Sequence, residues 1–110
     1  MEGKIIVTIF PQDKQKKLRP SLALPEFPKY GDVLVCGITS QIHQYIPALD
    51  LLLDKDHPDF KNTGLKFPGV RRLNMLTMIP ISNINGTIGQ ISASTHRSLL
   101  QSLADYLVYK

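Results

Sequence analysis

The chain has 110 residues, 43% of them hydrophobic and 20% charged, with a formal net charge of +4 and a sequence pI of about 9.3. This composition excludes a disordered chain, and the length corresponds to a single domain over residues 1–110. The positive charge favours an anionic partner, with nucleic acid as the first candidate.

Three strands are predicted in the first half of the chain. Residues Ile5 to Phe10 are apolar on both faces, which is typical of a strand buried on both sides. Leu18 to Leu24 resumes the apolar pattern around Pro20, which must lie where the sheet needs no backbone donor. Val33 to Ile38 is the clearest strand in the sequence.

The second half is predicted to contain two further strands. Residues 46–53 fit a strand or a short helix, and a polar loop follows over residues 54–64. Val70 to Ile79 is strand-like and ends at a proline. Asn85-Gly86 indicates a tight turn, with a short strand over Thr87 to Ile91 after it.

The C-terminal segment has helical periodicity. We expect a helix over Thr95 to Tyr106, in which Ser94 or Thr95 accepts the first free amide. Several short strands followed by one helix predict a mainly β (α+β) fold, a small barrel rather than βαβ units. The apolar stripe of the helix consists of Leu99, Leu100, Leu103 and Leu107.

No membrane segment and no reactive thiol are predicted. No run approaches the roughly 20 apolar residues that cross a bilayer, and the first residues lack an apolar signal segment. The single cysteine, Cys36, lies in the apolar run from Val33, where a free thiol packs as a small hydrophobe. A reducing compartment fits this usage, and we expect a soluble, cytoplasmic protein.

A cationic loop precedes the second predicted strand. Four cations lie within six positions, and Arg19 is the one that a strand start would hold in a defined direction. Its planar fork of donors suits phosphate oxygens, whereas lysines add diffuse attraction. A solvated charged loop is the alternative interpretation. The other three cations are Lys14, Lys16 and Lys17.

A polar cluster ends the third predicted strand. Thr39, Ser40 and Gln41 would place two hydroxyls and an amide at the rim of the fold, although such residues are also common where a strand simply turns. His43 could serve there as a general acid or base, but an exposed loop histidine is the simpler interpretation. Asp54 to Asp59 has the carboxylate alternation of a calcium loop but lacks its glycine and its final acid, so we predict no metal site and no cofactor.

Several stretches of the sequence are characteristic when they are read together and in order. Those of the first half are Gly3-Lys4-Ile5-Ile6-Val7, Lys17-Leu18-Arg19-Pro20-Ser21-Leu22-Ala23-Leu24 and Val35-Cys36-Gly37-Ile38-Thr39-Ser40-Gln41. Those of the second half lie at residues 64–66, 70–73 and 88–92. Together they resemble the MazF/PemK family of toxin–antitoxin toxins, and the resemblance spans nearly the whole sequence.

The resemblance implies a metal-independent endoribonuclease that cuts single-stranded RNA. It also implies an SH3-like barrel, a homodimer and an acidic antitoxin protein as partner. In such toxins the arginine of the Arg-Pro motif and the threonine of the Ile-Thr motif carry catalysis, and these are Arg19 and Thr39 here. RNA contacts are then expected from Ser40 and Gln41, with attraction of the backbone by Lys14, Lys16 and Lys17.

The implied reaction is attack of a ribose 2′-hydroxyl on the adjacent phosphorus, which leaves a 2′,3′-cyclic phosphate and a 5′-hydroxyl. Arg19 would stabilise the charge on the phosphorane. Because a guanidinium keeps its proton, this role suits it better than proton transfer. Thr39 would donate to a non-bridging oxygen or hold the nucleophile.

Two departures and two alternatives accompany the resemblance. Lys4 stands where the family usually has aspartate, and the loop over residues 11–18, which in the family helps to select sequence, is short. The cleavage sequence therefore cannot be transferred. The alternatives are a toxin of the same fold that binds a protein target such as gyrase, and an inactive family member. Apolar surface for a dimer is expected on Met75, Leu76, Met78 and Ile79.

Overall fold

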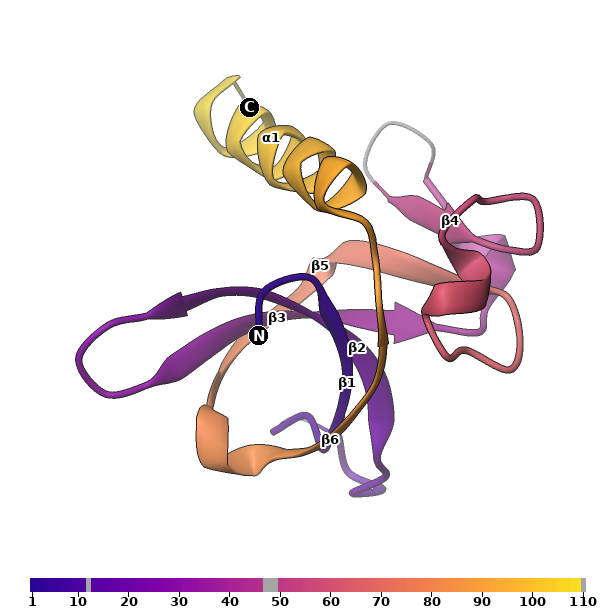
Figure 1. Cartoon of the computed structure of the whole chain (residues 1–110). Coiled ribbons are helices and arrows are strands. Elements are labelled where there is room, and N and C mark those ends of the chain that lie inside the picture. The colour runs from indigo at the N-terminus through magenta and orange to yellow at the C-terminus, as the bar shows by residue number, and fades with distance from the viewer. Residues whose placement is uncertain (12, 47–49, 110) are drawn as a thin grey trace.

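The computed structural model describes residues 1–11, 13–46 and 50–109, which form one antiparallel sheet and one α-helix (Figure 1). The order of the six strands is β4-β5-β3-β2-β1-β6. This confirms the mainly β class with a C-terminal helix. The strands are β1 Lys4–Thr8, β2 Arg19–Phe27, β3 Asp32–Thr39, β4 Leu51–Leu53, β5 Gly69–Pro80 and β6 Ile84–Gln90; the helix α1 is Ala93–Tyr109, and single 3-10 turns are η1 Ile42–Gln44, η2 Phe60–Asn62 and η3 Ile81–Asn83.

The sheet is bent but not closed. Within the described residues, β4 and β6 form its two edges and are not hydrogen-bonded to each other, so closure into a barrel is not observed. β4 is only three residues long, and β6, which pairs with β1, has no second strand partner among the described residues. Register shifts, which bend strands locally, occur between Cys36 and Ile38 where β3 pairs with β5, and also in the β1–β6 and β2–β3 pairs.

Both faces of the sheet are covered, as the sequence of the first strand predicts. Ile5 and Ile6 are each fully buried, and because neighbouring side chains of a strand point to opposite faces they belong to two different clusters. The strand ends at Thr8, earlier than predicted. One cluster contains Ile5, Leu22, Leu24, Cys36, Ile38, Leu53, Ile91 and Leu99, and the other Ile6, Phe10, Ala23, Val33, Val35 and Ile79.

The predicted tight turn at Asn85-Gly86 is wrong. Both residues lie within β6, where Gly86 pairs with Val7 of β1. The chain reverses earlier, in η3, directly after the proline that ends β5. The hydroxyl of Thr8 donates to the carbonyl oxygen of Asn83 at 2.8 Å, which holds this connection against β1.

The structure answers only in part whether residues 46–53 form a strand or a short helix. Residues 47–49 lie outside the described residues, and β4 shows that the end of the 46–53 segment is a strand. The apolar surface predicted along β5 is smaller than expected, because side chains alternate between its faces. Ile79 is buried in the core, Met75 and Leu76 are partly buried, and Met78 is 41% exposed.

The helix is longer than predicted and begins on a different cap. Ser92, rather than Ser94 or Thr95, accepts the backbone N–H of Thr95 on its hydroxyl at 3.3 Å. Leu99 is buried against the sheet, whereas Leu107 is 70% exposed, since the last turns of α1 extend past the sheet (Figure 1). Among the described residues, no helix is long and apolar enough to span a membrane.

The buried carboxylate of Asp59 ties the 54–64 segment to the start of α1. Its Oδ2 accepts hydrogen bonds from the backbone N–H and the hydroxyl of Ser92, both at 3.0 Å. Burial by itself raises the pKa of Asp59, but the hydrogen bonds from Ser92 and Thr95 outweigh it and hold the pKa below its ordinary value. The ionised form is therefore the one that the fold favours.

Replacing this carboxylate should give a pH-dependent loss of stability. A group whose folded pKa is depressed stabilises the fold above its unfolded pKa, and this contribution is lost as the pH falls through the folded value. We expect Asp59→Asn to lower the free energy of unfolding by about 1–3 kcal/mol at neutral pH. The difference in free energy of unfolding between the variant and the wild type should shrink below about pH 4. Urea unfolding at neutral pH and below pH 4 measures this difference, and the same difference at both would contradict the role of the ionised carboxylate.

Candidate functional site

The ends of two paired strands bring Arg19 and Thr39 to the same edge of the sheet. β2 and β3 are antiparallel with Ser21 opposite Gly37, and the same register continued by two residues places Arg19 level with Thr39. Arg19 is the first residue of β2 and Thr39 the last of β3. The two motifs singled out in the sequence are therefore neighbours in the fold.

Arg19 is held by an acidic residue of its own loop. Its Nε donates to Oδ2 of Asp13 at 2.9 Å, and the other carboxylate oxygen accepts the backbone N–H of Gln15 at 3.0 Å. The hydrogen bond from Arg19 and then that from Gln15 hold the pKa of Asp13 below its ordinary value. Among the described residues, nothing binds the terminal nitrogens of Arg19, and its side chain is 46% exposed. This geometry leaves the outer fork of the guanidinium ready for an anion.

Thr39 is oriented by the turn that follows it. Its hydroxyl oxygen accepts the backbone N–H of Gln41 at 3.1 Å, which leaves the hydroxyl proton available to donate elsewhere. The turn leads into η1, whose Gln44 accepts a hydrogen bond from Nη1 of Arg72 in β5 at 2.8 Å. The segment after Thr39 is thereby fixed to the sheet rather than left as a free strand end.

A small groove of about 130 Å³ lies beside Thr39. Its size is below the range of about 300–1,000 Å³ that small-molecule sites occupy, so it suits one group of an extended chain better than a whole ligand. Its wall comes from the end of β3, Pro20 of β2 and the segment that precedes β5. The lining residues are Pro20, Ile38, Thr39, Ser40, Leu65, Lys66, Phe67, Pro68 and Gly69.

The predicted lysines are exposed but do not line this groove. Lys14 and Lys17 lie on the loop between β1 and β2. Lys16, which adopts a positive φ of 56°, borders a separate hollow together with residues of η3. Ser40 lines the groove and Gln41 is exposed next to it, so the structure groups these two with Thr39 and places the lysines to one side.

Comparison with known proteins identifies the family. The chain matches the PemK-like, MazF-like toxins of type II toxin–antitoxin systems over residues 1–107. It belongs to this family. No curated protein matches this MazF/PemK-like chain by sequence.

Solved structures of other toxins share the fold of this MazF/PemK-like protein. The Mycobacterium tuberculosis toxin MazF-mt6 is 22% identical, with a TM-score of 0.70 over 94% of this chain and 95% of that one. An endoribonuclease in complex with its cognate antitoxin, from a mycobacterial species, is 14% identical, with a TM-score of 0.67 over 97% of this chain and 93% of that one. At these identities the likeness concerns the fold.

Three residues of the site were given no role in the sequence analysis, although Lys66 lies in one of the stretches that resemble the family. Asp13 orients Arg19, and Lys66 and Phe67 border the groove at Thr39. A signal for Asp13 exists, since it is the acidic residue next to a cationic loop and close enough to pair with it. Lys66 and Phe67 are far from Thr39 in sequence, and only the pairing of β5 with β3 brings them together.

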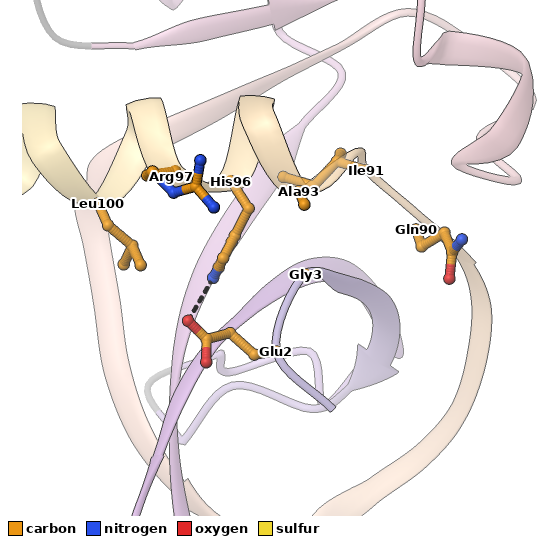
Figure 2. A pocket seen from close by; sticks show the side chains of 8 residues that line it. All are labelled: Glu2, Gly3, Gln90, Ile91, Ala93, His96, Arg97 and Leu100. Atoms are coloured by element: carbon orange, nitrogen blue, oxygen red, sulfur yellow. Dashed lines mark hydrogen bonds and ion pairs between the residues drawn. The ribbon is translucent and has the colours of Figure 1, made fainter.

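A larger hollow of this MazF/PemK-like fold lies elsewhere, between the N-terminus and α1. It has a volume of about 510 Å³, and Figure 2 shows His96 pointing from the helix toward Glu2, with Nε2 and Oε1 separated by 2.7 Å. Glu2 and Arg97 also line it, but no hydroxyl or thiol does. The contact joins the first residues of the chain to the first turn of the helix, which gives it a structural role.

Two other sequence features are structural as well. Cys36 is fully buried, and burial raises the pKa of its thiol to about 11, so the predicted core role is confirmed. In the acidic 54–59 segment, Asp54 accepts the backbone N–H of Asp56 and Asp59 binds Ser92. Within the part of the chain that is described, no three His, Cys, Asp or Glu side chains gather as metal ligands. His43 is exposed on η1.

Proposed function

We propose that this toxin is an endoribonuclease that cuts single-stranded RNA at the edge formed by β2 and β3. The observation that carries the proposal is that the β2–β3 register brings Arg19 level with Thr39, with Asp13 binding Nε of a guanidinium whose side chain is 46% exposed. Membership of the MazF/PemK-like family supports the same activity. Attraction of the RNA backbone falls to Lys14, Lys16 and Lys17 beside this edge.

The proposed chemistry needs these side chains, the RNA itself and solvent water. The 2′-hydroxyl of the nucleotide before the cut attacks phosphorus and gives its proton to solvent. The bond from phosphorus to the 5′ oxygen breaks, and that oxygen takes up a proton from solvent. Arg19 donates to the non-bridging oxygens as negative charge develops on them. Thr39 can donate one further hydrogen bond to the same phosphate, because its oxygen already accepts from Gln41. The products are a 2′,3′-cyclic phosphate and a 5′-hydroxyl.

An acidic antitoxin is the proposed protein partner, acting in the cytoplasm. One fold neighbour is an endoribonuclease in complex with its cognate antitoxin, which supports such a partner here. The net charge of +4 favours an acidic protein. An antitoxin that bound over Arg19 and the lysine loop would compete directly with RNA for this surface.

A homodimer is expected from the exposed apolar residues at the end of α1. Leu107 and Val108 are 70% and 69% exposed, and Tyr109 is 83% exposed. Light scattering at micromolar concentration should give twice the 12.3 kDa of one chain, and the double variant Leu107→Lys, Val108→Lys should shift the mass toward that of a monomer. A wild-type protein that is monomeric throughout this range would contradict the dimer.

The activity is tested with the purified protein and a panel of nucleic acids. We expect cleavage of long single-stranded RNA, and little cleavage of double-stranded RNA or single-stranded DNA. A fold-related toxin that acts on a protein target would leave all of them intact. Intact RNA after prolonged incubation with folded wild-type protein would therefore favour the non-catalytic alternative.

A further inference from the structure

An exposed aromatic side chain stands beside the proposed catalytic edge. Phe67 is 73% exposed and borders the groove of about 130 Å³ that Thr39 and Ser40 also line. Single exposed apolar residues are common on protein surfaces, so exposure by itself indicates nothing. What distinguishes Phe67 is its position next to Thr39 and the cationic Lys66, on a segment that is firmly held.

The segment that carries Phe67 is fixed at its N-terminal side. Thr63 is fully buried, and its hydroxyl donates to the carbonyl oxygen of Phe60 at 2.6 Å and accepts the N–H of Leu65 at 3.1 Å. Gly64 has a φ of +75° and no room for a Cβ, which would overlap the carbonyl of Ile88. The turn before Phe67 therefore packs closely against β6.

The other side of the segment is fixed by the sheet. Gly69 begins β5, and a Cβ there would lie 2.7 Å from Cγ2 of Ile38, so the backbone passes close under the end of β3. Leu65 packs against the core cluster, whereas Lys66 and Phe67 are exposed. With the backbone held on both sides, only the side-chain torsions of Phe67 need to be ordered when it binds a flat partner.

We propose that Phe67 is a stacking platform for one base of single-stranded RNA, with Lys66 beside it for the adjoining phosphate. This rests on the proposed nuclease function and names a substrate-binding residue that the Arg19 and Thr39 motifs do not include. An aromatic face next to cations is the arrangement that binds unpaired bases. Stacking depends on the π-face that every base has, so Phe67 contributes affinity and position but little base preference.

The test measures binding of RNA that cannot be cut. The probes are short 2′-fluoro single strands of A, C or U, which lack the attacking hydroxyl. We expect Phe67→Ala to weaken binding roughly 5- to 150-fold, by similar factors on all three probes, the range known for loss of one base–aromatic stack. Phe67→Tyr keeps the ring and should bind within about twofold of the wild type.

A matched control comes from the other end of the β2–β3 hairpin. Phe27 is 50% exposed but closes β2 at the end opposite Arg19, so Phe27→Ala should bind these probes like the wild type. If the wild type binds and cuts RNA and both Phe67→Ala and Phe27→Ala bind the probes as tightly as the wild type, the stacking role alone is overturned. A Phe67→Ala variant that changes the mass in light scattering but not RNA affinity would assign Phe67 to a protein interface and overturn it too. A wild type that neither binds nor cuts RNA would overturn the nuclease function and this inference with it.

Discussion

Arg19→Ala is expected to reduce RNA cleavage by roughly 10²–10³-fold, the loss that follows removal of one preformed donor to a developing oxyanion. The reason lies in when the interaction forms. The charge that Arg19 meets is largest at the phosphorane, so its removal lowers the rate at saturating RNA more than it lowers affinity. Single-turnover cleavage and binding to the 2′-fluoro strands separate the two effects. Wild-type rates in Arg19→Ala would contradict the assignment.

The lysines of the same loop supply the contrasting variant. Lys14, Lys16 and Lys17 are exposed and lie outside the groove, so changing all three to glutamine should remove backbone attraction without touching the reacting phosphate. Binding should weaken and its salt dependence should flatten. Cleavage at saturating RNA should remain nearly intact. If the lysine variant instead lost its saturated rate while keeping affinity, the division of roles between lysines and Arg19 would be wrong.

A large loss of stability is expected from Gly89→Ala in β6. An added Cβ would overlap the carbonyl groups of Thr63 and Asn62. Those backbone atoms cannot retreat, because Thr63 is fully buried and hydrogen-bonded on both sides of its hydroxyl. Overpacking lowers the free energy of unfolding by about 1–3 kcal/mol and occasionally more. A clash with a fixed backbone should reach or exceed the upper end of this range. We expect a fall in melting temperature of about 10 °C or more.

The same strand offers the control for this substitution. A Cβ at Gly86 would meet only Cγ2 of Val7, at an ordinary contact distance of 3.7 Å. Gly86→Ala should therefore be nearly neutral, or slightly stabilising because it restricts the unfolded chain. Similar melting temperatures for the two variants would mean that the 62–64 turn does not pack tightly on β6. The Lys66–Phe67 segment would then lack the anchor described above.

The sequence predicts those parts of the fold in which local pattern and burial agree. Ile5 and Ile6 are apolar on adjacent positions, and this predicts a strand buried on both faces without knowledge of its neighbours. Asn85-Gly86 misleads because its turn propensity is local, whereas the pairing of Gly86 with Val7 is a long-range constraint. Leu107 misleads similarly: helical spacing predicts its face, but not that the sheet ends before that turn.

The candidate site divides in the same way. Arg19 and Thr39 follow from motifs that resemble a known family, and the β2–β3 register then explains why they lie together. Asp13 could be suspected from its charge beside the lysine loop. Phe67 could not, since its closeness to Thr39 depends on how β5 pairs with the end of β3, which no local pattern encodes.

The most direct test of the central claim is cleavage of single-stranded RNA by the purified wild-type protein in EDTA, with the chemistry of the new ends determined. We predict cutting without divalent metal, with 2′,3′-cyclic phosphate and 5′-hydroxyl ends. A strand with deoxyribose at the nucleotide before the cut should bind and remain whole. Cleavage that requires magnesium, 5′-phosphate ends, or cutting of the deoxy-substituted strand would contradict a 2′-hydroxyl attack assisted by Arg19 and Thr39.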